Sequence, residues 1–299
     1  MNQTSPAIVA QSAVRRLPRL ALILFCVAYV LPGFIGREPW KQDDVSAFGV
    51  MLGMAAGHGS WWQPSVLGLP LENTGPLAYW LGAVFIRLLP FLPAELAVRI
   101  PFAALLGITL ACTWYATYHL ARLRSAQPVA FAFGGEAQPV DYARTLADAA
   151  LLALVACLGL AQLSHETTPD LAQLAAGSAM LMGAARLAHN EASSAWRSLF
   201  TWAVGVAALA FSGAPWIAAL SGSALLLVLW WQARQDSDRI QWPRPLLLAM
   251  GALLLVLVAA AAAGLLNTGG AMSVTPSFGW RRWGRLLLWF TWPAWPLVL

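Results

Sequence analysis

Long apolar runs separated by short polar segments dominate the chain from residue 17 onward. The runs cover residues 17–35, 94–120, 145–163, 171–187, 199–211, 216–231 and 246–266, and a last run follows residue 285. Most approach or reach the roughly 17–25 residues that a helix needs to cross a bilayer core. The pattern predicts an all-α, polytopic transmembrane helical bundle with about eight spans.

Residues 36–93 break this pattern with glycines, prolines and acids. Within them, residues 44–56 place apolar side chains at helical spacing, namely Val45, Phe48, Met51, Leu52 and Ala55. Residues 76–89 form a second apolar stretch that is short for a span. We expect two amphipathic helices that lie at the membrane interface within a long first loop.

Composition supports a membrane protein. Of the 299 residues, 59% are hydrophobic and 10% are charged, whereas soluble proteins carry about 25% charged residues. With the N-terminus in the cytoplasm, the arginine-rich loops 121–145, 186–197 and 233–244 all fall inside, as the positive-inside rule requires. Residues 36–93, 164–170, 212–215 and 267–280 then fall outside. The cluster Arg281, Arg282 and Arg285 is the exception, because it lies on the outer side.

Other features limit the possible functions. The basic residues are scattered, so no nucleic-acid partner is expected, and no phosphate loop, dinucleotide fingerprint or serine-nucleophile elbow occurs. The cysteines Cys26, Cys112 and Cys157 lie in apolar runs without metal-type spacing, which favours buried packing. Many of the 16 tryptophans lie at predicted span ends and are typical of an aromatic belt. The chain ends within an apolar stretch, so we interpret residues 1–299 as one transmembrane domain that continues beyond residue 299.

Two adjacent carboxylates, Asp43 and Asp44, follow the first apolar run in the segment "PWKQDDVSAF". A carboxylate at the membrane edge can take the proton of an acceptor hydroxyl, and a neighbouring like charge favours proton uptake. The alternative is a solvated residue that caps the following helix, since Asp favours the N-cap position.

The order of motifs between Arg37 and Leu123 resembles the GT-C superfamily of membrane glycosyltransferases. The likeness is greatest to the bacterial protein-mannosyltransferase and aminoarabinose-transferase-like group. The family's Trp-x-Pro-Asp-Glu element stands here as Trp40-Lys41-Gln42-Asp43-Asp44. It is followed by Gly59-Ser60-Trp61, by Pro64, Gly68 and Pro70, by "GPLAYWLGA" from Gly75, and by an Ala-x-Arg element that ends at Arg99. The specific likeness covers about 90 residues.

The resemblance implies a transferase of the bacterial inner membrane with its active site on the periplasmic side. Its donor would be a polyprenyl-phosphate-linked sugar, and its acceptor a protein, a lipid or a glycan. Asp43 would be the catalytic base, and Asp44 replaces the glutamate that usually follows. A divalent metal ion is the one cofactor left open.

Six further residues are candidates for substrate binding. Glu72 lies one residue before the place where relatives carry an acid that some use for a metal, and Asp170 matches an acid that relatives carry near the fourth span. His165 could bind a metal or a phosphate. In "FSGAPW", Gly213 replaces a lysine of the relatives, so Arg281, Arg282 and Arg99 become candidates to contact the donor phosphate, because arginine suits phosphate geometry. Anchoring at lipid headgroups is the alternative for Arg281 and Arg282.

Two functions of other classes remain open. A lipid-linked sugar transporter or flippase would need polar residues buried in mid-span and facing a pathway, whereas the polar residues here gather at the outer ends of the predicted spans. A non-enzymatic assembly subunit is the other alternative.

Overall fold

The chain forms an almost entirely helical protein in the computed structural model. The structure describes residues 8–66, 68–71, 75–189, 195–235, 243–268 and 280–297. Within these ranges, the one sheet is a two-stranded antiparallel hairpin of β1 (Ser65–Val66) and β2 (Leu69–Pro70). The predicted all-α class is therefore confirmed.

Helices account for the rest of the architecture. The long helices are α1 (Arg19–Val30), α2 (Gln42–Ala55), α3 (Leu77–Leu88), α4 (Ala94–Ala121), α5 (Pro139–Ala156), α7 (Pro169–His189), α8 (Ala195–Phe211), α9 (Pro215–Gln235), α10 (Pro243–Ala262) and α12 (Trp280–Phe290). The short ones are α6 (Leu158–Leu163), α11 (Leu265–Thr268) and the 3₁₀ helices η1 (Gln11–Ala13), η2 (Arg124–Ala126) and η4 (Trp295–Leu297).

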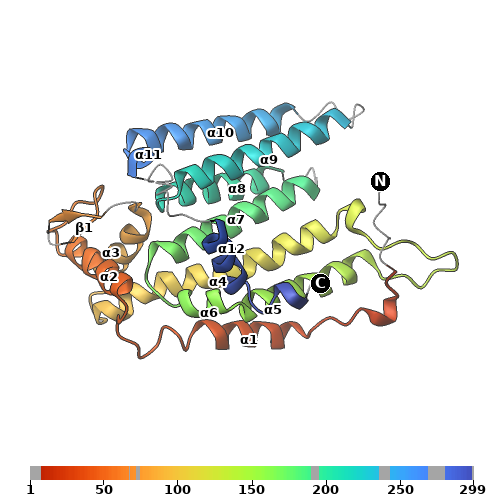
Figure 1. The fold of residues 1–299 in the computed structure, drawn as a ribbon, viewed down its shortest axis with the longest axis horizontal. Helices are drawn as coiled ribbons and strands as arrows, with labels where there is room; N and C mark the ends of the chain where they lie inside the picture. Colours follow the sequence, from red (N-terminus) through yellow and green to blue (C-terminus); the bar gives the residue numbers. More distant parts are fainter. Residues whose placement is uncertain are drawn as a thin grey trace.

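The long helices run roughly side by side and stack in layers (Figure 1). In this view α9 and α10 form the top layer, α7 and α8 lie below them, then α4 and α5, and α1 runs along the bottom. Helices α2 and α3 and the hairpin cover one end, on the left of the figure, which we call the site end. The other end holds the N-terminal arm, residues 8–18, and the α4–α5 connection, residues 122–138, and we call it the arginine end.

Small residues set the closest helix contacts. A side chain added at Gly183 would place its Cβ 2.5 Å from the backbone nitrogen of Trp202, and one at Gly205 would lie 2.5 Å from that of Met180. Trp202 itself is fully buried between these helices. Because glycine lets two backbones approach closely, α7 and α8 pack as a tight pair, as helices do in membranes.

Two helices of the described part, α4 and α7, are long and apolar enough to cross a membrane. Five more apolar helices in the described ranges are shorter, namely α1, α3, α8, the 215–228 part of α9 and the 246–262 part of α10. Large apolar side chains face outward on several of them, among them Leu20 and Ile23 of α1 and Leu254 and Leu255 of α10. The larger number of spans expected from the sequence remains a prediction.

Two local expectations differ from the structure. The third apolar run was expected at residues 145–163, but α5 begins at Pro139, because proline suits the first helical turn and Asp141 favours the same end of the helix. The run then breaks at Cys157, whose backbone is extended, and continues as α6. In α2 the helix is confirmed, but its buried face is not the expected one, since Val45 and Leu52 are exposed while Asp44, Ala47, Val50 and Met54 are buried with Met51.

Candidate functional site

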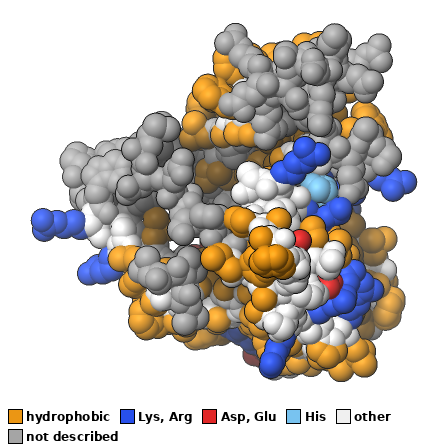
Figure 2. Space-filling model, turned by 90° about the vertical axis from the view of Figure 1, so that its right-hand side faces the viewer, with side chains coloured by type: hydrophobic (Ala, Val, Ile, Leu, Met, Phe, Trp, Pro, Cys, Tyr) orange, Lys and Arg blue, Asp and Glu red, His pale blue; other side chains and the backbone are white. Residues whose placement is uncertain are grey.

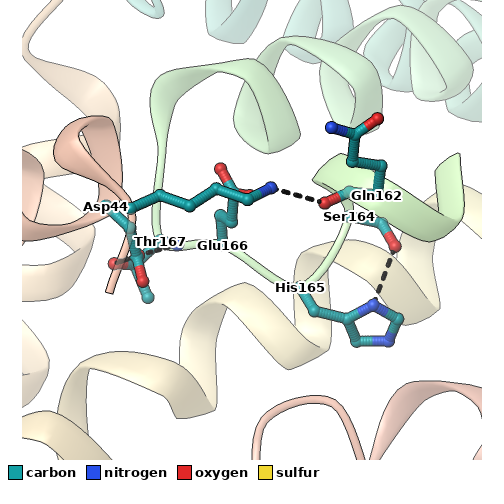
Figure 3. A network of polar contacts seen from close by, with 7 residues as sticks. Asp44, Gln162, Ser164, His165, Glu166 and Thr167 are labelled. Atoms are coloured by element: carbon teal, nitrogen blue, oxygen red, sulfur yellow. Dashed lines mark hydrogen bonds and ion pairs between the residues drawn. The ribbon is translucent and has the colours of Figure 1, made fainter. Parts of the chain in front are cut away.

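The first turn of α2 is bound to the α6–α7 connection at the site end. Asp44 is only 3% exposed, and its Oδ1 accepts hydrogen bonds from the backbone N–H of Thr167 at 2.8 Å and from the Thr167 hydroxyl at 2.7 Å. Lys41 Nζ donates to the carbonyl of Gln162 at 3.0 Å and forms an ion pair with Glu166. Figure 3 shows this network, in which residues more than 120 positions apart meet.

The network gives Asp44 a structural role. A buried carboxylate that accepts two hydrogen bonds is held in place and is screened from an acceptor in solution. The expectation that Asp44 shares catalysis is therefore not supported by the structure. Burial of Asp44 also explains the orientation of α2, because the bond to Thr167 turns this face of the helix inward and leaves Val45 outside.

Asp43 lies in the same first turn but takes no part in the network. Its side chain is exposed, and the N-cap of α2 is Lys41 rather than Asp43, so the capping alternative is not what the structure shows. The charge of Asp43 acts on Asp170, which is exposed in the first turn of α7. The structure thus brings together two accessible carboxylates that are 127 positions apart in sequence.

Asp170 lines an apolar cavity of about 590 Å³ between α4, α6, α7 and α8. Leucine is the commonest residue in the wall, and Phe290 of α12 closes one side by packing on Gly159. Gly177 faces open space in this wall, because a Cβ added there would meet nothing within 4 Å. One turn below Asp170, Gln173 Nε2 donates to the Ser212 carbonyl at 2.8 Å and fixes the α8–α9 turn.

That turn also packs against the "GPLAYW" segment. A Cβ at Gly75 would lie 2.1 Å from the Phe211 carbonyl oxygen and 2.2 Å from the Gly213 nitrogen, so only glycine fits there. Gly213 itself has a φ of +95°, which side-chain-bearing residues rarely adopt. Two of the motifs singled out in the sequence are therefore in backbone contact beside the cavity.

His165 joins the α6–α7 connection to the end of α1. Its Nε2 lies 3.0 Å from the Tyr29 carbonyl and its Nδ1 lies 3.2 Å from Ser164 Oγ, and the ring packs on Phe34 and against Gly33. The carbonyl can only accept, so Nε2 carries the proton of the neutral ring. Burial lowers the pKa of His165, and the positive charge of Arg37 lowers it further, against the raising effect of the Tyr29 bond. Both ring nitrogens are thus engaged, which leaves neither for a metal or a phosphate.

Arg99 is likewise structural. It is 6% exposed, and its guanidinium donates to the Phe34 carbonyl at 3.2 Å, which fixes the turn after α1. The negative charge of Asp44 is near enough to act on it. The expected contact of Arg99 with a donor phosphate is not supported, because the side chain is buried and donates to the Phe34 carbonyl.

Arg37 is a more accessible cation. It is half-buried, stacks on the Trp40 ring at 5.2 Å, and its charge acts on both Arg99 and His165. It lines a second, polar cavity of about 590 Å³ together with Glu38, Phe48 and Glu95. This cavity lies between the α1–α2 segment, Phe48 of α2 and the start of α4.

The remaining predicted residues fall elsewhere. Glu72 lies outside the described residues, and so does the side chain of Arg282. Arg281 is exposed in the first turn of α12, and its side chain makes no hydrogen bond or ion pair with the parts of the chain that are described. Across those same parts, no group of three or more His, Cys, Asp or Glu side chains is placed to hold a metal ion.

Sequence reasoning missed the residues that build the site around Asp43. Lys41, Glu166 and Thr167 carry the network, and Gln173 fixes the cavity edge. A signal was present for the first two, because a lysine and a glutamate in an apolar chain must find partners at a span end. Thr167 and Gln173 carried no such signal, since both residue types are common in any connection or helix.

No protein-family model, curated protein or solved structure matches this chain.

Proposed function

We propose that the protein is a membrane glycosyltransferase that moves a sugar from a polyprenyl-phosphate carrier to an acceptor hydroxyl. The observation that carries the proposal is the position of Asp43. It is exposed, it lies within electrostatic reach of Asp170, and Asp170 lines an apolar cavity. A long isoprenoid with a phosphate and a sugar at its end needs this combination of an apolar space and a reactive carboxylate at its edge.

The proposal places the helical layers in a bacterial inner membrane with about eight spans. The site end, with its first loop at residues 36–93, faces the periplasm, and the arginine end faces the cytoplasm. This orientation is supported by the distribution of arginines, because Arg15, Arg16, Arg19, Arg122, Arg124 and Arg144 all belong to the arginine end. The resemblance of residues 37–123 to the GT-C superfamily leads to the same orientation.

In the proposed reaction, the Asp43 carboxylate takes the proton of the acceptor hydroxyl as its oxygen attacks the anomeric carbon. The bond from that carbon to the phosphate oxygen breaks, and its electron pair leaves with the polyprenyl phosphate. The charge on the leaving phosphate requires a cation nearby, and Arg37, Arg281 and Arg282 are the candidates. The Lys41–Glu166 and Asp44–Thr167 contacts hold the first turn of α2 against the segment that precedes Asp170, so that Asp43 stays within electrostatic reach of Asp170.

An assay of Asp43→Asn tests the proposal directly. The purified chain in detergent receives a radiolabelled polyprenyl-phosphate sugar and an extract of acceptors, and transfer is followed as loss of label from the lipid. We expect Asp43→Asn to lower the rate about 10²–10⁴-fold, as removal of a general base does, whereas the matched Glu38→Gln keeps it. Undiminished transfer by Asp43→Asn would remove this residue from the mechanism.

The flippase and assembly-subunit alternatives predict a different outcome. A flippase moves labelled lipid across reconstituted vesicles without forming a glycosylated product. In the described part of the chain, the buried charged side chains lie near the ends of the bundle, with Asp44, Arg99 and Glu166 at the site end and Asp148 beside the first residues of α1. This arrangement favours chemistry at a surface over a polar path through the bundle.

A further inference from the structure

A second apolar space lies between α1, α4 and α5. This groove has a volume of about 650 Å³, and its walls include Leu22, Val30, Leu110 and Leu151. Gly107 of α4 leaves the wall open, since an added Cβ would meet nothing within 4 Å. The volume is in the range of roughly 300–1,000 Å³ that holds a small amphiphile, and the site assigned to the sugar donor does not use it.

One end of the groove carries positive charge. Arg19 at the start of α1 and Arg144 in α5 both line it, and neither makes an ion pair or hydrogen bond with the described residues. Two acids of α5, Asp141 and Asp148, are already engaged by other groups. Asp141 pairs with Arg16 and accepts a bond from Gln11, while Asp148 accepts hydrogen bonds from Trp114 Nε1 at 2.8 Å and from the Leu17 backbone at 3.2 Å.

Aromatic rings line the groove toward the same end. Trp114 and Tyr118 are stacked with their centroids 5.4 Å apart, and the Arg122 guanidinium lies 5.6 Å from the Tyr118 ring. Tryptophan and tyrosine prefer the headgroup level of a membrane. Figure 2 looks at the arginine end and shows Lys and Arg side chains at several places around apolar surface.

We propose that this groove binds an anionic phospholipid, with an acyl chain along α1 and α4 and the phosphate between Arg19 and Arg144. Charge complementarity selects the occupant, because basic clusters beside a membrane attract acidic headgroups and neither guanidinium group is paired with a residue that the structure describes. The inference rests on the proposed membrane placement but not on the transferase chemistry. A bound lipid would fill the gap beside α1, whose other end is held to the site by the Tyr29–His165 contact.

Native mass spectrometry of the full chain in detergent tests the proposal with phosphatidylglycerol and phosphatidylcholine as probes. We expect phosphatidylglycerol to be retained about tenfold more than phosphatidylcholine. The double variant Arg19→Gln/Arg144→Gln should lose this preference, and Arg19→Lys/Arg144→Lys should keep most of it. Arg197→Gln, which removes an exposed arginine away from the groove, should have no effect.

A second variant tests whether the apolar part of the groove holds the acyl chain. Gly107→Leu fills the groove and should lower retention of phosphatidylglycerol, while Gly251→Leu, on the exposed face of α10, should not. Leucine favours a helix more than glycine by roughly 0.5–1 kcal/mol, so loss of folding is not expected for either. Equal retention of both lipids by the native chain, or retention unchanged in the double glutamine variant, overturns the proposal. Failure of sugar transfer leaves it standing, because binding is measured without turnover.

Discussion

Asp44 and Thr167 are joined by two hydrogen bonds to a single carboxylate oxygen, at 2.7 and 2.8 Å, across 123 positions of sequence. The pair connects the helix that carries Asp43 to the segment that precedes Asp170. Because both partners are buried, the connection is shielded from water and from the screening that weakens surface contacts. The relative position of the two accessible carboxylates depends on this connection.

Thr167→Val should therefore destabilise the protein by about 1.5–3 kcal/mol, because a hydrogen bond to a charged group is lost while the shape of the side chain is kept. The free energy of unfolding, measured by thermal denaturation in detergent, checks this. Thr201→Val is the matched control, since the Thr201 hydroxyl donates to the Arg197 carbonyl of its own helix and to no other group among the described residues. If the two substitutions lowered the free energy of unfolding equally, the bond to Asp44 would contribute no more to stability than a hydrogen bond within one helix.

Gly177→Leu should fill the cavity beside Asp170. We expect kcat/KM for a long-chain lipid-linked donor to fall by about tenfold or more, because the chain loses its apolar contacts, while the melting temperature stays the same or rises. Steady-state transfer assays with a long and a truncated isoprenoid donor measure this. For Gly177→Leu, kcat/KM should fall less with the truncated donor than with the long one. Gly251→Leu should leave kcat/KM unchanged with both donors. An equal fall of kcat/KM with both donors would mean that the lipid chain binds outside this cavity.

Gly75→Ala should be severely destabilising, since its Cβ would lie about 2 Å from the backbone of the Phe211–Gly213 turn. Overpacking typically costs about 1–3 kcal/mol, and more where backbone atoms must move. In contrast, Gly53→Ala in α2 meets nothing within 4 Å and should stabilise by roughly 0.5–1 kcal/mol through helix propensity. Thermal unfolding of the two variants side by side gives the comparison.

Stability should fall at mildly acidic pH because of His165. Its pKa is lowered in the folded protein, so the unfolded chain binds a proton more readily. The contribution is present in full above the unfolded value of about 6.5 and is lost as the pH falls through the lowered value of the folded state. Melting temperatures between pH 8 and pH 5 should show this loss, and His165→Gln should flatten the profile over the same range. An identical profile for the variant would assign the pH dependence to other groups.

Much of the helix order followed from the sequence because each apolar run is bounded by prolines, glycines or arginines. Helices α4 and α7 begin and end within two residues of the predicted limits. Periodicity could not choose the buried face of α2, since Val45 and Met54 are equally apolar and a long-range bond from Asp44 decides the matter. The break at Cys157 was also invisible, because no proline or glycine occupies that position.

For the candidate site, the sequence predicted that the first loop and the "SHETTPD" segment lie on the same side of the membrane, and the structure places the two segments in contact at one end of the bundle. Successive antiparallel helices place every second connection at the same end of a bundle, so the order of the apolar runs is enough to predict it. The roles within the site could not be predicted in the same way. His165, Arg99 and Asp44 carry groups that can bind a substrate or a metal. In the structure His165 bonds to the Tyr29 carbonyl, Arg99 to the Phe34 carbonyl and Asp44 to Thr167. Which polar side chain stays free depends on distances that spacing along the chain does not contain.

Helix α4 is a partition between two compartments. Thr109 and Thr113 border the cavity beside Asp170, while Leu110 and Trp114, on another face of the helix, border the groove that ends at Arg19 and Arg144. Protein interiors are close-packed and yield little, so an occupant that widens one compartment narrows the other. Under the proposed function, the lipid composition of the bilayer would then adjust how easily a lipid carrier enters the cavity beside Asp170, at a distance from Asp43.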